Sequence, residues 1–99
     1  MSALLNEIQD RWHRMFTALA AGDDVPPGSR LRTEGLMEAI VISGLVPPEQ
    51  VTRKMGDCYL RAFGHSLEED FGRNWQTFYP FPQIPAMAKR APVYPSAAD

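Results

Sequence analysis

The sequence predicts an all-α protein: a small bundle of three longer helices and one short helix, with an extended proline-rich C-terminal arm. Apolar residues recur every three or four positions through most of residues 2–75, the spacing that places one apolar stripe along a helix. Prolines are then frequent over residues 80–95, where they exclude a continuing helix. We therefore divide the chain into a helical domain, residues 1–75, and an arm, residues 76–99.

The composition is that of an ordinary globular domain. The chain has 99 residues, of which 44% are hydrophobic and 22% charged, and its formal net charge is −2. A general binder of nucleic acid or anionic membrane normally carries a basic excess, so we expect neither function. There is one cysteine and no run near the ~20 apolar residues of a membrane span. We expect a cytoplasmic protein that forms no internal disulfide.

The first helix is expected at residues 2–21. Ser2 is a suitable N-cap, because its hydroxyl can accept a hydrogen bond from a free backbone N–H of the first turn. Glu7 and Asp10 each precede an arginine by four positions, which favours ion pairs on the solvent side. A surface loop, residues 22–28, follows. The apolar stripe of this helix is Leu4, Leu5, Ile8, Trp12, Met15, Phe16 and Leu19.

Residues 30–64 predict a helical hairpin around which the rest of the chain is organised. Gly44 supplies the positive φ that ends a second helix, residues 29–43, and Pro47 and Pro48 favour the start of a third, residues 48–63. The inward side chains of the third helix are expected to be Val51, Met55, Cys58, Tyr59, Ala62 and Phe63.

The second helix is expected at the centre of the domain or in a subunit contact, because residues 39–42 are apolar nearly all round. Gly35 weakens a helix by ~1 kcal/mol relative to alanine, and a close approach of the first helix would explain it. We place Leu31, Leu36, Met37, Ile40 and Val41 inward, and Arg30, Arg32, Glu34 and Glu38 outward.

The short fourth helix is expected to begin at Ser66. Ser66 and Glu69 form the S-x-x-E capping box, in which each side chain accepts a hydrogen bond from the other residue's backbone N–H. This helix should present Leu67, Phe71 and Trp75 to the core, with Gly72 weakening its middle.

The arm is too apolar for a solvated tail. We expect residues 76–88 to dock on the helices with Tyr79, Phe81 and Ile84 as anchors, and residues 96–99 to stay mobile. Lys89, Arg90 and Tyr94 should lie at the edge of the docked region, where a partner protein could reach them.

Catalytic chemistry is not indicated. Cys58 could pair with His13 or His65 as an activated thiolate, but it shares a helical face with Met55 and Tyr59, which favours a small buried hydrophobe. The histidines lack a metal-ligand spacing, and there is no glycine-rich phosphate loop. We expect no enzyme, cofactor or metal site.

We therefore expect a non-enzymatic protein–protein interaction or accessory module. Its partner would be another protein or a second copy in a homodimer, bound through the apolar second helix and the arm.

Two alternatives remain open. The first is a DNA-binding helix-turn-helix regulator that reads bases with Thr52, Arg53 and Lys54 of the third helix. Against it, acidic residues flank these three positions at Glu49 and Asp57. The weaker alternative is an accessory subunit that holds a small hydrophobic ligand between helices, in a pocket lined by Met37, Met55 and Tyr59.

Overall fold

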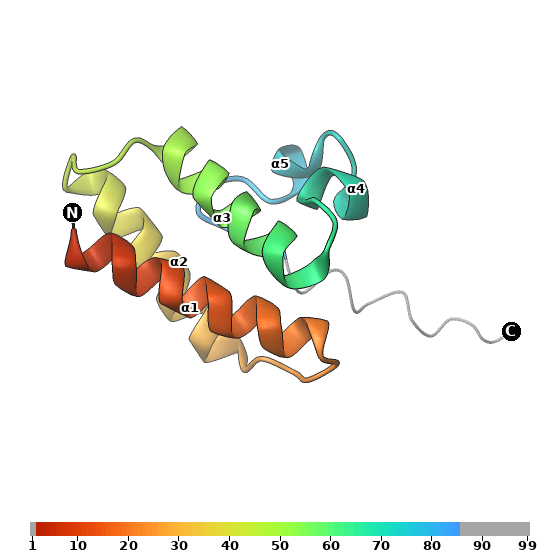
Figure 1. Ribbon diagram of the computed structural model, residues 1–99. Coiled ribbons are helices and arrows are strands. Elements are labelled where there is room, and N and C mark those ends of the chain that lie inside the picture. Colours follow the sequence, from red (N-terminus) through yellow and green to blue (C-terminus); the bar gives the residue numbers. More distant parts are fainter. Residues whose placement is uncertain (1, 86–99) are drawn as a thin grey trace, which may run out of the picture.

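The fold is a small helical bundle in which α1 packs against both α2 and α3 (Figure 1). The computed structural model describes residues 2–85, and within them no strand is present. The predicted all-α class, with three longer helices, is confirmed. The helices are α1 (Ala3–Ala20), α2 (Pro27–Ile42), α3 (Pro48–Phe63), α4 (Leu67–Phe71) and α5 (Trp75–Phe78).

Local chemistry sets both the start and the outer side of α1. The Ser2 hydroxyl accepts hydrogen bonds from the backbone N–H of Leu4, at 3.1 Å, and of Leu5, at 3.3 Å. Along the solvent side, Glu7 pairs with Arg11 at 2.8 Å and Asp10 pairs with Arg14 at 3.4 Å. The predicted cap and both predicted ion pairs are confirmed.

In the hairpin of α2 and α3, the helices end and begin where the glycines and prolines of the sequence predict. Gly44, with φ of 80°, follows α2, and Gly64, with φ of 83°, follows α3. Pro48 is the first residue of α3, where the absence of a proline N–H costs nothing. The same preference puts Pro27 at the first position of α2, so this helix begins two residues earlier than expected.

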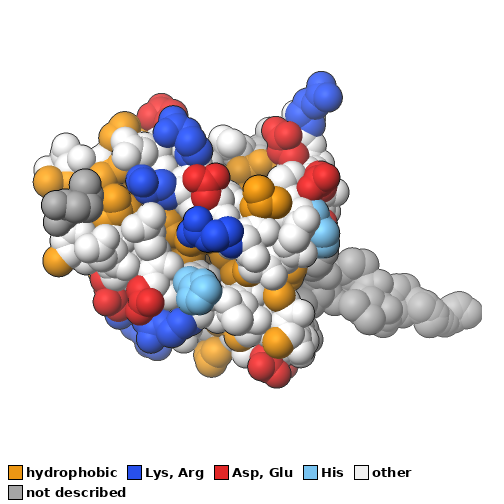
Figure 2. Space-filling model, in the orientation of Figure 1, with side chains coloured by type: hydrophobic (Ala, Val, Ile, Leu, Met, Phe, Trp, Pro, Cys, Tyr) orange, Lys and Arg blue, Asp and Glu red, His pale blue; other side chains and the backbone are white. Residues whose placement is uncertain are grey.

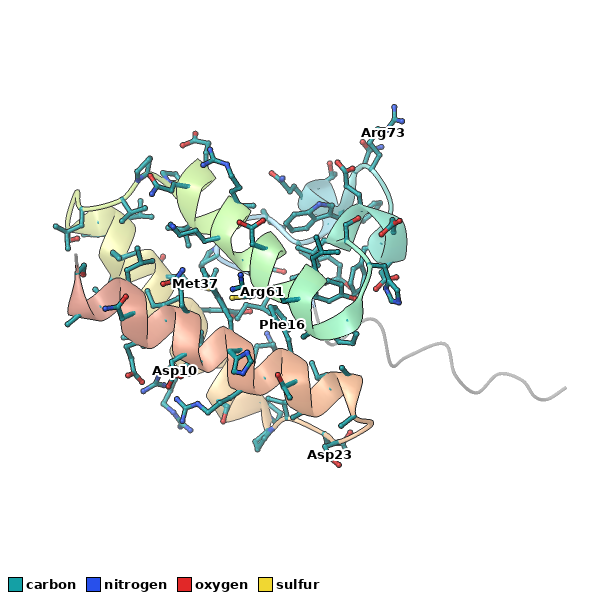
Figure 3. The ribbon with its side chains drawn as sticks, in the orientation of Figure 1. Asp10, Phe16, Asp23, Met37, Arg61 and Arg73 are labelled. Carbon is teal, nitrogen blue, oxygen red and sulfur yellow. The ribbon has the colours of Figure 1, made fainter. Side chains whose placement is uncertain are left out.

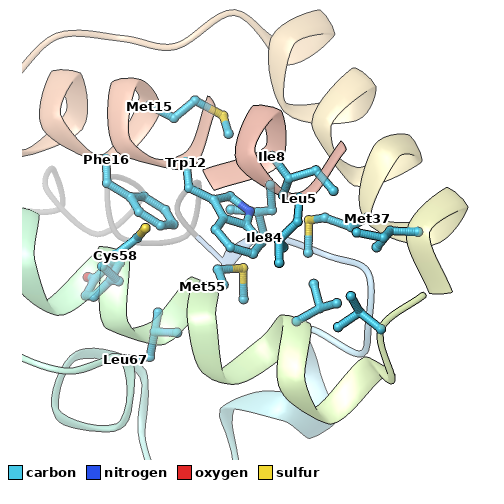
Figure 4. Packing of buried hydrophobic residues seen from close by; sticks show 14 of the residues in the cluster. Leu5, Ile8, Trp12, Met15, Phe16, Met37, Met55, Cys58, Leu67 and Ile84 are labelled. Carbon is cyan, nitrogen blue, oxygen red and sulfur yellow. The ribbon is translucent and has the colours of Figure 1, made fainter. Parts of the chain in front are cut away.

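The core lies mainly between α1 and α3 (Figure 4). Trp12 and Phe16 of α1 are fully buried, and the Phe16 ring meets the ring of Tyr59 edge-on at a centroid distance of 5.3 Å. Figure 3 shows Phe16 and Met37 inside the bundle, whereas Arg73 projects away from it. The central helix is therefore α1. Of the two expectations for the second helix, the central position is wrong, and a subunit contact stays a prediction.

The orientation of α2 differs from the expected one. Leu31, expected inward, is 57% exposed, whereas Glu34, expected outward, is only 8% exposed. Arg30, also expected outward, is half-buried. Because α2 carries apolar residues on two sides, its hydrophobic pattern does not determine which side is buried. The buried residues of α2 are Thr33, Glu34, Met37 and Ile40.

Gly35 lies on the exposed side of α2. A Cβ atom built there meets no other atom within 4 Å among residues 2–85. The expected close approach of the first helix at Gly35 is therefore wrong, and the packing seen in this chain gives no reason for a glycine.

The C-terminal helices are shorter than expected. The capping box is confirmed: Ser66 Oγ accepts from the Glu69 N–H at 3.1 Å, and Glu69 Oε1 accepts from the Ser66 N–H at 2.6 Å. Gly72, with φ of 97°, ends α4 instead of weakening its middle. Trp75 is buried as expected, but it begins the separate turn α5, so the arm is helical over its first residues.

Candidate functional site

The expected partner-binding residues of the arm have different locations. Ile84 is 2% exposed and belongs to the core, while Tyr79 and Phe81 are half-buried and pack against it. The Tyr79 ring also meets the Phe71 ring of α4, edge-on at 5.8 Å. These three side chains therefore contact the protein's own helices. The expectations for Lys89, Arg90 and Tyr94, as for the rest of the chain beyond residue 85, lie outside the described residues.

A buried carboxylate joins the arm to α2. Glu34 Oε2 accepts a hydrogen bond from the Ile84 backbone N–H at 2.8 Å, and a second from the Arg30 guanidinium at 3.1 Å. Both donors help to compensate the loss of hydration that a buried carboxylate suffers. Sequence reasoning missed this site, because a spacing of four predicts an Arg30–Glu34 pair but not its burial.

Tyr59, Asp70 and His65 form a polar group where α3 meets α4. The Tyr59 hydroxyl donates to Asp70 Oδ2, and His65 Nδ1 lies 2.9 Å from the same oxygen. Burial, and then the hydrogen bond and negative charge of Asp70, raise the pKa of Tyr59 well above its ordinary value of 10.0. Tyr59 is thus a neutral hydrogen-bond donor that fixes α4 on α3, and it is not suited to act as a base.

Cys58 is not arranged as a nucleophile. It is 4% exposed, and burial raises the pKa of its thiol, an effect that the nearby Arg61 guanidinium opposes in part. Arg61 donates to its sulfur across 3.6 Å, whereas His13 and His65 are exposed. Within residues 2–85, no cluster of three or more His, Cys, Asp or Glu side chains could hold a metal ion.

The residues of the two alternative functions are spread over the core and over α3. Met37, Met55 and Tyr59 are at most 2% exposed and belong to the hydrophobic core cluster. On α3, Arg53 is exposed and Thr52 and Lys54 are half-buried. Thr52, Arg53 and Lys54 are consecutive in α3, so their side chains project in different directions around the helix.

A hollow of about 450 Å³ lies between α1, the following loop and the start of α2. Arg11, Arg14 and Arg32 line it. The carboxylates of Glu7 and Asp10 lie 2.8 Å and 3.4 Å from the first two guanidinium groups. Much of the positive charge is therefore already compensated, and the hollow has no strong preference for an anion.

The exposed side of α2 carries two large apolar side chains in contact with solvent. We call it the outer face of α2; Ile42 on it is 79% exposed and Leu31 57%. Leu45, which follows Ile42 closely in the connection from α2 to α3, is 60% exposed. Figure 2 shows hydrophobic side chains gathered at the end of the molecule where Figure 1 places this connection. The outer face comprises Leu31, Arg32, Gly35, Glu38, Ala39 and Ile42.

Comparisons with known proteins give no match: no protein-family model, no curated protein and no solved structure matches this chain. None of the helices within residues 2–85 is both long and apolar enough to cross a membrane.

Proposed function

We propose that this protein is a non-enzymatic protein-interaction module and that the outer face of α2 is its binding surface. The observation that carries the proposal is the exposure of Leu31 and Ile42 on the side of α2 that faces away from α1. Large apolar side chains aligned on one exposed helix face are typical of a surface that another protein covers.

The polar groups that could support catalysis have internal roles instead. Tyr59 holds Asp70, Glu34 holds Ile84, and Cys58 is buried beside Arg61. Each of these contacts stabilises the fold, which supports a binding function over a chemical one. A cytoplasmic location is part of the proposal, because the chain's one cysteine is a buried free thiol that requires no oxidising compartment.

Site-specific photo-cross-linking in the native cells tests this function. A photoreactive amino acid at Leu31 or at Ile42 should give a discrete cross-linked protein on illumination. Leu60 is the matched control site, because it is an exposed leucine, 46% accessible, on α3. Equal cross-linking from Leu60, or none from Leu31 and Ile42, would contradict the proposal.

A further inference from the structure

We propose that the partner of the outer face of α2 is a second copy of this chain, bound as an antiparallel helix pair about a two-fold axis at Gly35. This inference rests on the proposed function and names its partner. In such a pair the two helices run in opposite directions and cross at Gly35. A residue that precedes Gly35 in one copy therefore lies level with the residue that follows Gly35 by the same number of positions in the other copy.

The charges of the outer face match under this symmetry. Arg32 and Glu38 stand three positions before and after Gly35, and both are exposed. Arg32 lies at the border of the outer face, because its side chain also passes over Gly28 and lines the hollow beside α1. Among residues 2–85, neither side chain has an ion-pair partner, although Glu7, Asp10 and Glu34 all do. The two-fold pair brings Arg32 of each copy level with Glu38 of the other, on opposite edges of the helix contact, so that two identical pairs of opposite charges attract across it. Such charges favour the antiparallel register over a parallel one, which would align like charges.

The sizes of the side chains match as well. Leu31 and Ala39 stand four positions before and after Gly35, so each leucine would lie against an alanine of the other copy. Large residues facing small ones let two helices pack without voids.

Gly35 then has a role that the single chain does not give it. A glycine weakens a helix relative to alanine, and a Cβ atom at this position would meet nothing within 4 Å in one copy. At the crossing point of the pair, two facing glycines allow the helix backbones to approach closely. Close approach in turn lets Leu31 reach Ala39 of the other copy.

The first experiment measures the mass of the purified full chain by sedimentation equilibrium over a concentration series. We expect twice the chain mass at high micromolar protein, falling to the single-chain mass on dilution, because one helix pair is a small interface. A single-chain mass at every concentration overturns the inference. The photo-cross-linking at Leu31 and Ile42 then decides whether another protein covers the outer face.

The second experiment compares Gly35→Ala with Gly56→Ala. Both glycines lie inside a helix at negative φ, and a Cβ at Gly56 would make an ordinary 3.8 Å contact with Leu67. Both variants should fold, and dilute samples should melt no lower than wild type. We expect Gly35→Ala to raise the dimer dissociation constant by about tenfold or more, through crowding at the crossing point, and Gly56→Ala to leave it unchanged. Equal dissociation constants in the two variants would overturn the crossing at Gly35.

The third experiment uses the charge symmetry. Arg32→Glu and Glu38→Arg each place like charges opposite one another in the homodimer, and each should weaken it by about tenfold. When the two variants are mixed, one copy carries two acidic side chains at these positions and the other carries two basic ones. Both pairs in the heterodimer then combine opposite charges again, so the heterodimer should regain wild-type affinity at low salt. If the mixed variants dimerise no more tightly than either variant alone, the antiparallel register is ruled out.

The outcomes separate this inference from the proposed function. If the purified chain is monomeric while a photo-cross-linker at Leu31 captures a different protein, the second-copy inference fails and the interaction function stands. If the chain is monomeric and no cross-link forms, both fail.

Discussion

The carboxylate of Glu34 in α2 accepts a hydrogen bond from the backbone N–H of Ile84, 50 residues further along the chain, across 2.8 Å. Ile84 is 2% exposed and Glu34 8%, so water has little access to either group. The contact fixes one point of the arm against α2 and gives both buried polar groups a partner. It therefore couples the stability of α2 to the placement of the arm.

Replacing Glu34 by alanine should strongly destabilise the fold. The change leaves the Ile84 N–H buried without an acceptor and removes the counter-charge of Arg30, which together should cost about 2–3 kcal/mol. Urea unfolding of a dilute sample measures the loss. Glu38→Ala is the control, an exposed glutamate of the same helix whose loss should cost within about 0.5 kcal/mol. Equal losses in the two variants would show that the Glu34 contact does not stabilise the fold.

Truncating Ile84 tests the attachment of the arm through its apolar side chain. Ile84→Ala removes fully buried methyl groups and should lower the free energy of unfolding by about 2–4 kcal/mol. Phe78→Ala removes a larger side chain that is 71% exposed, and should change it by no more than about 0.5 kcal/mol. Thermal melts of the two variants compare them directly, and a larger loss for Phe78→Ala would be incompatible with the burial of Ile84.

Tyr59 should make the protein sensitive to alkali. Because the pKa of Tyr59 is raised in the folded state, the folded protein keeps the phenolic proton at a pH where the unfolded chain loses it. This contribution to stability is complete below the ordinary tyrosine value of 10.0 and is lost progressively as the pH rises above it. We expect the urea midpoint to fall above this pH in wild type, and to fall less steeply in Tyr59→Phe. Identical pH dependences would argue against a raised pKa.

Cys58 should resist alkylation in the folded protein. Burial both blocks access to the sulfur and raises the pKa of the thiol, so less thiolate is present at a given pH. Iodoacetamide should modify native protein at least about 100-fold more slowly than urea-unfolded protein, because reaction requires an opening of the core. Mass spectrometry of timed samples gives both rates. Similar rates would mean that α3 opens readily around Cys58.

The features that the sequence predicts well depend on residues within about one helical turn of one another. The cap at Ser2, the capping box of Ser66 and Glu69, and the proline start of α3 each involve residues no more than four positions apart. The stripes of α1 and α3 were also clear, because each helix has one apolar side. Local chemistry of this kind can be read directly from residue types.

The features that sequence missed depend on distant residues. The buried side of α2 is determined by what lies against it, and the acceptor role of Glu34 depends on a backbone N–H at Ile84 that no local pattern encodes. The sequence predicts Gly72 in the middle of a helix, whereas its φ of 97° ends α4. Gly35 is unusual inside a helix, but the close approach that the sequence predicts there is absent among residues 2–85.

The central position of α1 has a consequence for synthesis. Phe16 packs edge-on against Tyr59 of α3, and α3 is synthesised after both α1 and α2. Until then, the nascent chain carries an amphipathic helix whose aromatic stripe has no stable cover, since α2 alone contacts α1 less extensively. Such a segment is a natural binding site for chaperones that protect nascent chains, and mutations that delay α3 formation should increase that dependence before they affect the finished fold.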